Sequence, residues 1–377
     1  MGVIRIRQNT SYLPLTIFLG ICTIGVLLLS LLEKIFGLAN SICLRICNTI
    51  NFPAVLYNIA SGFLFGVILL GFVIASTVFL VWLERKVAGH MQVRRGPMYT
   101  GGWHGWLQTL IDGFKLIFKE DIIPEGADRF IFILAPYLVF VPAVTVMAAI
   151  PFSEKLVPVN LNMGLIYVFG FSSIAAIGVI MGGWSSNNKY SLLGGLRAAA
   201  QMVSYEVPRA LSVLGVMALA GSFSLVDIVN AQEKIWFIIP QFLAFAVYFI
   251  ASLAEINRSP FDIPEAESEL VAGFHTEYSS LRFSFFFLAE YANMVIACAL
   301  ATVLFLGGWK PLPFFGFIPS IFWFLGKTYF LAFIVIWLRW TLPRFRVDQL
   351  MELSWKILIP IAFLNFIFTI MIIPFIR

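Results

Sequence analysis

Long apolar runs alternate with short polar segments along almost the whole chain. Nine of these runs contain about 20 residues, which is long enough to cross a hydrocarbon core of about 30 Å. Backbone polar groups inside a bilayer must be satisfied within their own segment, so runs of this length are expected to be helices. The runs lie near 13–32, 60–83, 129–151, 163–183, 203–222, 236–254, 285–308, 322–339 and 356–376. The pattern predicts an all-α polytopic transmembrane helix bundle of eight or nine spans.

The first run differs from the others in its flanks. Arg5 and Arg7 precede residues 13–32 as they would in a signal peptide, but the run is too long and no small-residue cleavage site follows it. We interpret it as a signal anchor. Residues 1–59 are then an extra N-terminal helix with an amphipathic connector, and residues 60–377 form the main bundle.

The polar loop 84–128 contains a helical pattern of its own. Turn residues at Gly96-Pro97 precede a segment, Trp106 to Lys119, in which polar side chains recur at helical spacing opposite an apolar stripe. This spacing predicts an amphipathic helix at the membrane surface.

Composition agrees with a membrane protein and limits its chemistry. The 377 residues are 60% hydrophobic and only 12% charged, about half the charge of a soluble domain. The 4 cysteines and 3 histidines are scattered, in no spacing typical of zinc, haem or iron–sulfur ligands. We therefore predict no metal site, and any redox centre must belong to a partner. The net charge of +5 is explained by membrane topology rather than by nucleic-acid binding.

Most lysines and arginines fall on one side of the predicted bundle, which sets its orientation. The N-terminus and the loops 84–128, 184–202, 255–284 and 340–355 are predicted to be cytoplasmic, and the C-terminus lies on the other side.

Four glutamates then approach the membrane from that same cytoplasmic side. Glu84 and Glu255 end predicted spans, Glu206 falls in the first turn of one, and Glu290 lies in the early turns of another. Ionisable residues in membrane segments are costly and mark functional sites by default. Their common depth predicts a shared polar pocket or channel.

Residues 254–270 place five carboxylates in one segment between apolar runs, with Glu265 and Glu269 four residues apart. Crowded carboxylates in a poorly solvated site hold protons more tightly, as a proton-loading site requires. The alternative is a solvated acidic loop that docks a basic partner. His275 follows, and a lone loop histidine is interpreted as a surface residue.

The segment Gly194 to Glu206 combines small residues with Arg197 and Gln201. Small residues allow close helix packing, while the polar side chains need partners. Either a structural ion pair or a proton relay at Glu206 satisfies this need.

Several segments in register resemble the H-type membrane subunit of respiratory complex I, the proton-pumping NADH–quinone oxidoreductase. They are Glu84-Arg85-Lys86 with Gln92-Val93-Arg94-Arg95-Gly96-Pro97, the segments 114–121, 194–206 and 257–269, Ala272-Gly273-Phe274-His275-Thr276-Glu277-Tyr278-Ser279, and 341–351. The resemblance covers roughly residues 60–376.

This resemblance implies roles for particular residues. The quinone path would be bordered by Arg94, Lys115, Arg258, Phe261, Asp262 and Glu265. Proton coupling would involve Glu84, Glu206, Glu255, Glu267, Glu269 and Glu290. Supporting roles would fall to Arg85, Arg197, Gln201, Tyr205 and Tyr278.

The family also implies partners and a location. Quinone would be the substrate, and FMN and iron–sulfur clusters would reside in peripheral subunits, beside small and antiporter-like membrane subunits. The complex would lie in the cell's inner membrane.

The sequence leaves two alternatives, the membrane anchor of a membrane-bound hydrogenase and a stand-alone cation/proton antiporter. Pro208-Arg209 departs from the family pattern, so a kink and an extra charge are expected just after Glu206.

Overall fold

The computed structural model describes the chain except residues 1–53, 155, 265–266, 312–317 and 377. The chain divides into two units, Met1–Ile68 and Leu69–Arg377, and the candidate site lies within the second. The predicted anchor at 13–32 and residues 33–53 of its connector lie outside the described residues.

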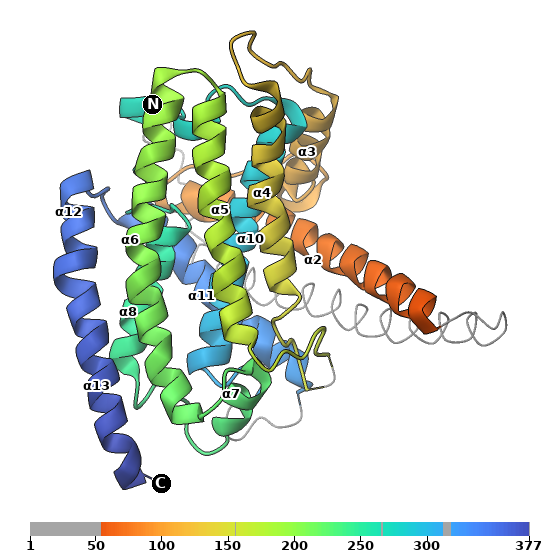
Figure 1. Cartoon of the computed structure of the whole chain (residues 1–377). Helices are drawn as coiled ribbons and strands as arrows, with labels where there is room; N and C mark the ends of the chain where they lie inside the picture. Colours follow the sequence, from red (N-terminus) through yellow and green to blue (C-terminus); the bar gives the residue numbers. More distant parts are fainter. Residues whose placement is uncertain (1–53, 155, 265–266, 312–317, 377) are drawn as a thin grey trace, which may run out of the picture. The chain divides into compact units, whose positions relative to one another are not determined.

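The described part is all-α (Figure 1). Seven helices are long and apolar enough to cross a membrane among the residues described. Six of them are α2 (Ala54–Met91), α4 (Arg129–Met147), α5 (Gly164–Ser185), α6 (Lys189–Ala220), α10 (Ser280–Phe305) and α11 (Ser320–Thr341). The seventh is formed by α12 (Val347–Glu352), a π-helical turn (Leu353–Leu358) and α13 (Ile359–Ile376).

Shorter helices connect these spans. They are η1 (Trp103–Gly105), α3 (Gln108–Phe118), α7 (Leu225–Ala231), α8 (Phe242–Glu255), α9 (Glu267–Leu270) and η2 (Gly273–His275). The α3 helix confirms the amphipathic segment predicted at 106–119, and its apolar side chains, such as Phe114 and Phe118, are exposed.

Helix α10 forms the centre of the bundle because its second half, from Met294 to Phe305, is apolar or small on every side. In the most apolar 18-residue stretch of α10, about four fifths of the helix is buried inside the protein. It packs against α4 and α11, while α6 packs against α5, α8 and α13 (Figure 1). The candidate site lies where α6, α8 and α10 converge.

Helix α6 is longer than predicted. It begins at Lys189, where the Asn188 side chain accepts a hydrogen bond from the backbone N–H of Tyr190, and it ends at Gly221 in a left-handed conformation. The segment 189–202, predicted as loop, is therefore helical, and the helix continues through Pro208 without interruption. Glu206 lies near the middle of α6 and not in a first turn, so that prediction was wrong.

Helix α8 is shorter than the predicted span 236–254. Its 14 residues extend about 21 Å, and residues 236–241 form turns instead of helix. The apolar run is as long as predicted, but its helical part begins only after Gln241, whose side chain donates to Thr369 of α13.

Candidate functional site

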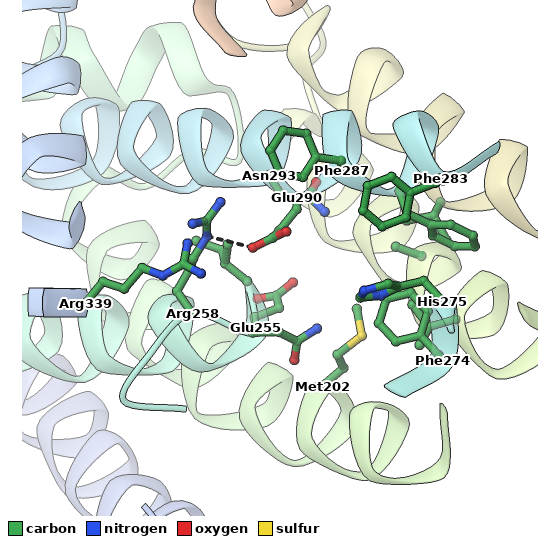
Figure 2. A pocket seen from close by; sticks show the side chains of 16 residues that line it. Met202, Glu255, Arg258, Phe274, His275, Phe283, Phe287, Glu290, Asn293 and Arg339 are labelled. Carbon is green, nitrogen blue, oxygen red and sulfur yellow. Dashed lines mark ion pairs between the residues drawn. The ribbon is translucent and has the colours of Figure 1, made fainter. Parts of the chain in front are cut away.

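A cavity of about 180 Å³ lies inside the bundle (Figure 2). Arg258 and Arg339 lie at one end, and the aromatic rings of Phe274 and Phe283 lie at the other (Figure 2). The remaining wall includes Glu255, Glu290, Asn293, Met202 and His275. A space with both charged and aromatic walls can hold a polar ligand or water molecules within an otherwise apolar bundle.

Arg258 joins the glutamates of two helices. Its side chain is 2% exposed, with Nη1 lying 2.9 Å from Oε2 of Glu84 and Nε lying 2.7 Å from Oε1 of Glu290. Burial alone would lower the pKa of Arg258, but the carboxylates of Glu290 and Glu84 raise it well above its ordinary value. The guanidinium is therefore a permanent positive charge.

Glu84 in turn accepts from three partners. Arg339 donates from Nη1 to Oε1 at 2.6 Å, and the Tyr291 hydroxyl donates to Oε2 at 2.8 Å, beside the bond from Arg258. The Tyr291 ring also lies 4.2 Å from the Arg258 guanidinium. Two arginines and two glutamates thus balance one another, which is how a protein tolerates charge away from water.

The loop after α8 is held in place by Gln201. Its Nε2 donates to the carbonyls of Ala254 and Phe261, each at 2.7 Å. Phe261 stacks on Phe345 with ring centroids 5.5 Å apart, and Asp262 pairs with Arg344 at 3.2 Å. These contacts aim Arg258, which lies between the two carbonyls in sequence, into the bundle.

A second polar cluster adjoins the cavity. Arg209 of α6 forms an ion pair with Glu255 and donates from Nη2 to the Ser172 hydroxyl at 3.0 Å. One turn before Arg209, Glu206 accepts a hydrogen bond from the Ser173 hydroxyl. The expected extra charge after Glu206 is therefore paired inside the bundle.

His275 is a cavity residue, and its interpretation as a surface loop residue was wrong. Its ring lies edge-on between those of Phe274 and Phe283, with centroids 4.9 and 5.4 Å away. Burial lowers the pKa of His275 to about 4. The imidazole is thus neutral at pH 7. The aromatic residues around it in the sequence were the available signal.

Three of the four predicted glutamates converge, since Glu255 and Glu290 line the cavity and Arg258 joins Glu84 to Glu290. Glu206 instead contacts Ser173. Glu265 lies outside the described residues, and so does the side chain of Glu267.

The other predicted residues lie away from the cavity. Arg94 and Lys115 are exposed, and Arg94 donates to Gln92 at 2.6 Å. Pairs at the surface join Arg85 to Asp112 at 2.5 Å and Arg197 to Glu269 at 2.7 Å.

Two predicted tyrosines have structural bonds. The Tyr205 hydroxyl donates to the Leu350 carbonyl at 2.8 Å. The Tyr278 hydroxyl donates to the Phe132 carbonyl at 3.1 Å, and the two rings stack with centroids 4.1 Å apart. Burial raises the pKa of Tyr278 to about 12.

Sequence reasoning missed Arg339 and Tyr291 as parts of this network and left Arg209 without a partner. In the sequence, Arg339 cannot be distinguished from the basic residues that set the orientation of the bundle in the membrane, because it lies near the end of a span. Tyr291 follows Glu290 directly, and this adjacency was the only signal for it.

Within the described residues, no group of three or more histidine, cysteine, aspartate or glutamate side chains is arranged to hold a metal ion.

A helical bundle that buries an arginine–glutamate network among long apolar helices defines a multi-pass membrane protein with a polar interior. Its sequence matches the NADH dehydrogenase family over residues 64–370. It is 54% identical over 315 residues to the H subunit of NADH-quinone oxidoreductase from Anoxybacillus flavithermus, covering 84% of this chain and 95% of that protein. The corresponding protein of Geobacillus kaustophilus is 52% identical over 312 residues, covering 83% and 94%. That of Bacillus mycoides is 53% identical over 307 residues, covering 81% and 92%.

The chain belongs to the family of NADH-quinone oxidoreductase H subunits. The resemblance inferred from the motifs is confirmed.

Proposed function

We propose that this chain is the membrane subunit of a proton-translocating NADH–quinone oxidoreductase, at the junction with the peripheral arm. It forms part of the quinone chamber and couples quinone reduction to proton movement through the cavity bounded by Glu255 and Glu290. The observation that carries the proposal is the buried network of Arg258 with Glu84 and Glu290 at the wall of that cavity.

The physical basis of coupling is electrostatic. Reducing a quinone near the network changes the local charge, and in a poorly solvated site such a change alters how strongly nearby carboxylates bind protons. Arg258 cannot release its proton. The glutamates that line the cavity, Glu255 and Glu290, are therefore the groups that exchange protons, while Arg258 fixes the position of Glu290.

The assignment of the quinone path rests on the family. Arg94 and Lys115 border it, together with the loop that begins at Arg258, and the N-terminus is cytoplasmic. The electrons come from iron–sulfur and flavin subunits of the peripheral arm, and the antiporter-like subunits receive the coupling signal. The exposed positions of Arg94 and Lys115 are consistent with a path at the interface with those partners.

The test is a Glu290→Gln substitution in the assembled complex in membrane vesicles. Quinone reductase activity and NADH-driven proton translocation should both fall severalfold, while NADH oxidation by ferricyanide should be unchanged because that acceptor takes electrons before they reach the membrane. Glu352→Gln is the matched control, since Glu352 is exposed and pairs with the exposed Lys356 four residues later. Unchanged quinone reduction and pumping in Glu290→Gln would refute the proposed function.

A further inference from the structure

Arg209 is a charged residue in the middle of a membrane-spanning helix, and its side chain is only 7% exposed. Its guanidinium lies 4.8 Å from the centre of the Phe169 ring, donates to Ser172 and pairs with Glu255. An arginine in a bilayer is costly unless it is paired, and this one has three kinds of partner. Because arginine does not deprotonate in proteins, its charge is permanent.

Arg209 lines a second cavity beside the first. This cavity of about 30 Å³, enough for about one water molecule, is also lined by Ser172 and Tyr248. Glu255 lines both this cavity and the larger one, as do Met202 and Asn293. Glu255 thus stands between the Arg258 network on one side and the Arg209 cluster on the other.

The Arg209 cluster contains a further acid that the larger cavity does not reach. Glu206 precedes Arg209 by three residues on α6, and the partners of these two residues, Ser173 and Ser172, are adjacent on α5. Residues three apart on a helix share a face. Arg209 therefore faces the same neighbouring helix as Glu206 while it holds Glu255.

We infer that Arg209 is a positioning residue for proton coupling, whose fixed charge holds the Glu255 carboxylate at the boundary between the two cavities, on the side of Glu206. The inference rests on the proposed function. It adds that a fixed positive charge holds Glu255 beside the smaller cavity.

The experiment compares Arg209→Met, Arg209→Gln and Arg209→Lys in the assembled complex, with Lys189→Met as the control. Lys189 also carries a positive charge on α6, but it lies exposed at the first residue of the helix. Assembly is measured first, and the number of protons translocated per electron transferred to quinone is measured next.

In the two neutral variants this ratio should fall to less than about half of the parental value, because removing one partner leaves the other buried charge uncompensated. Arg209→Lys should retain most of the ratio, since it keeps the charge, and Lys189→Met should retain all of it. A merely structural arginine would change assembly and not the ratio.

Two outcomes overturn the inference. One is a parental ratio in an assembled neutral variant, and the other is failure of both neutral variants to assemble while Arg209→Lys assembles with a normal ratio and stability. If Glu290→Gln uncouples but Arg209→Met does not, only this inference fails. If neither substitution affects pumping, the proposed function fails with it.

Discussion

The guanidinium of Arg258 and the carboxylate of Glu84 lie 2.9 Å apart although 174 positions separate them in the chain. The first residue comes from the irregular segment after α8, and the second comes from the last turns of α2. Their contact ties the loop to the bundle at the point where the cavity begins.

Replacing Arg258 by Met should destabilise the protein by about 3–5 kcal/mol, because it leaves Glu84 and Glu290 as buried carboxylates without this partner. The melting temperature and assembly of the purified complex measure the effect. Arg346→Met is the control, since Arg346 pairs with Asp348 at the surface and such pairs contribute about 1 kcal/mol or less. Equal melting temperatures for the two variants would contradict this account of the network.

Replacing Gln201 by Leu should lower the free energy of unfolding by about 1–3 kcal/mol, because the buried carbonyls of Ala254 and Phe261 each lose one of two donors and keep only a backbone N–H. The loop carrying Arg258 should then become more accessible, which hydrogen exchange of residues 254–262 measures. Gln349→Leu is a matched change at an exposed position. Parental exchange in the Gln201→Leu variant would show that the loop is held by other contacts.

Two glycine-to-alanine changes should have opposite effects on the stability of the folded protein. A Cβ at Gly194 would lie 2.6 Å from the Cα of Gly273 in η2. Alanine at position 194 should therefore displace η2 and lower the free energy of unfolding by about 1–3 kcal/mol. At Gly113 of α3 a Cβ meets nothing within 4 Å, and alanine should stabilise the helix by up to about 1 kcal/mol. Melting temperatures of both variants in the complex test the pair, and a stabilised Gly194→Ala variant would contradict the close approach.

His275 should make stability depend on pH. In the unfolded chain the imidazole binds a proton near pH 6.5, but in the folded protein only near pH 4, because its pKa is lowered by burial. Between these values the unfolded state binds more protons, so the free energy of unfolding falls as the pH falls. The total loss in the free energy of unfolding is about 3 kcal/mol.

The variant His275→Gln carries no titratable group at this position and should lose that part of the pH dependence. The difference in melting temperature between the variant and the parent should therefore shift in favour of the variant from pH 7 to pH 4. A difference that is constant across this range would mean that the imidazole titrates normally.

Much of the fold could be predicted from the sequence because bilayer physics acts on local composition. An apolar run of sufficient length must be a helix wherever it packs, and seven of the predicted spans correspond to the long apolar helices of the described residues. Helix ends were less predictable. The start of α6 at Lys189 depends on the cap formed by the Asn188 side chain, which composition does not reveal.

Part of the candidate site was also predictable, because a charged side chain in a membrane segment is costly and therefore conspicuous in the sequence. The cost of burying a carboxylate singled out Glu84, Glu255 and Glu290 before any partner was known. Their partners could not be predicted, because an arginine at the end of a helix, such as Arg339, is indistinguishable from a topological anchor in the sequence. His275 was misjudged because exposure of a loop residue is a property of the packed bundle.

The sequence by itself determined that this chain is a bundle of membrane-spanning helices with costly acids near the ends of several of them. Only the tertiary structure decided which charges meet, that Arg258 joins Glu84 to Glu290 and that Arg209 holds Glu255. The physical reason is that helix formation in a bilayer depends on local hydropathy, whereas an ion pair between distant helices depends on their rotation and depth, which only packing specifies.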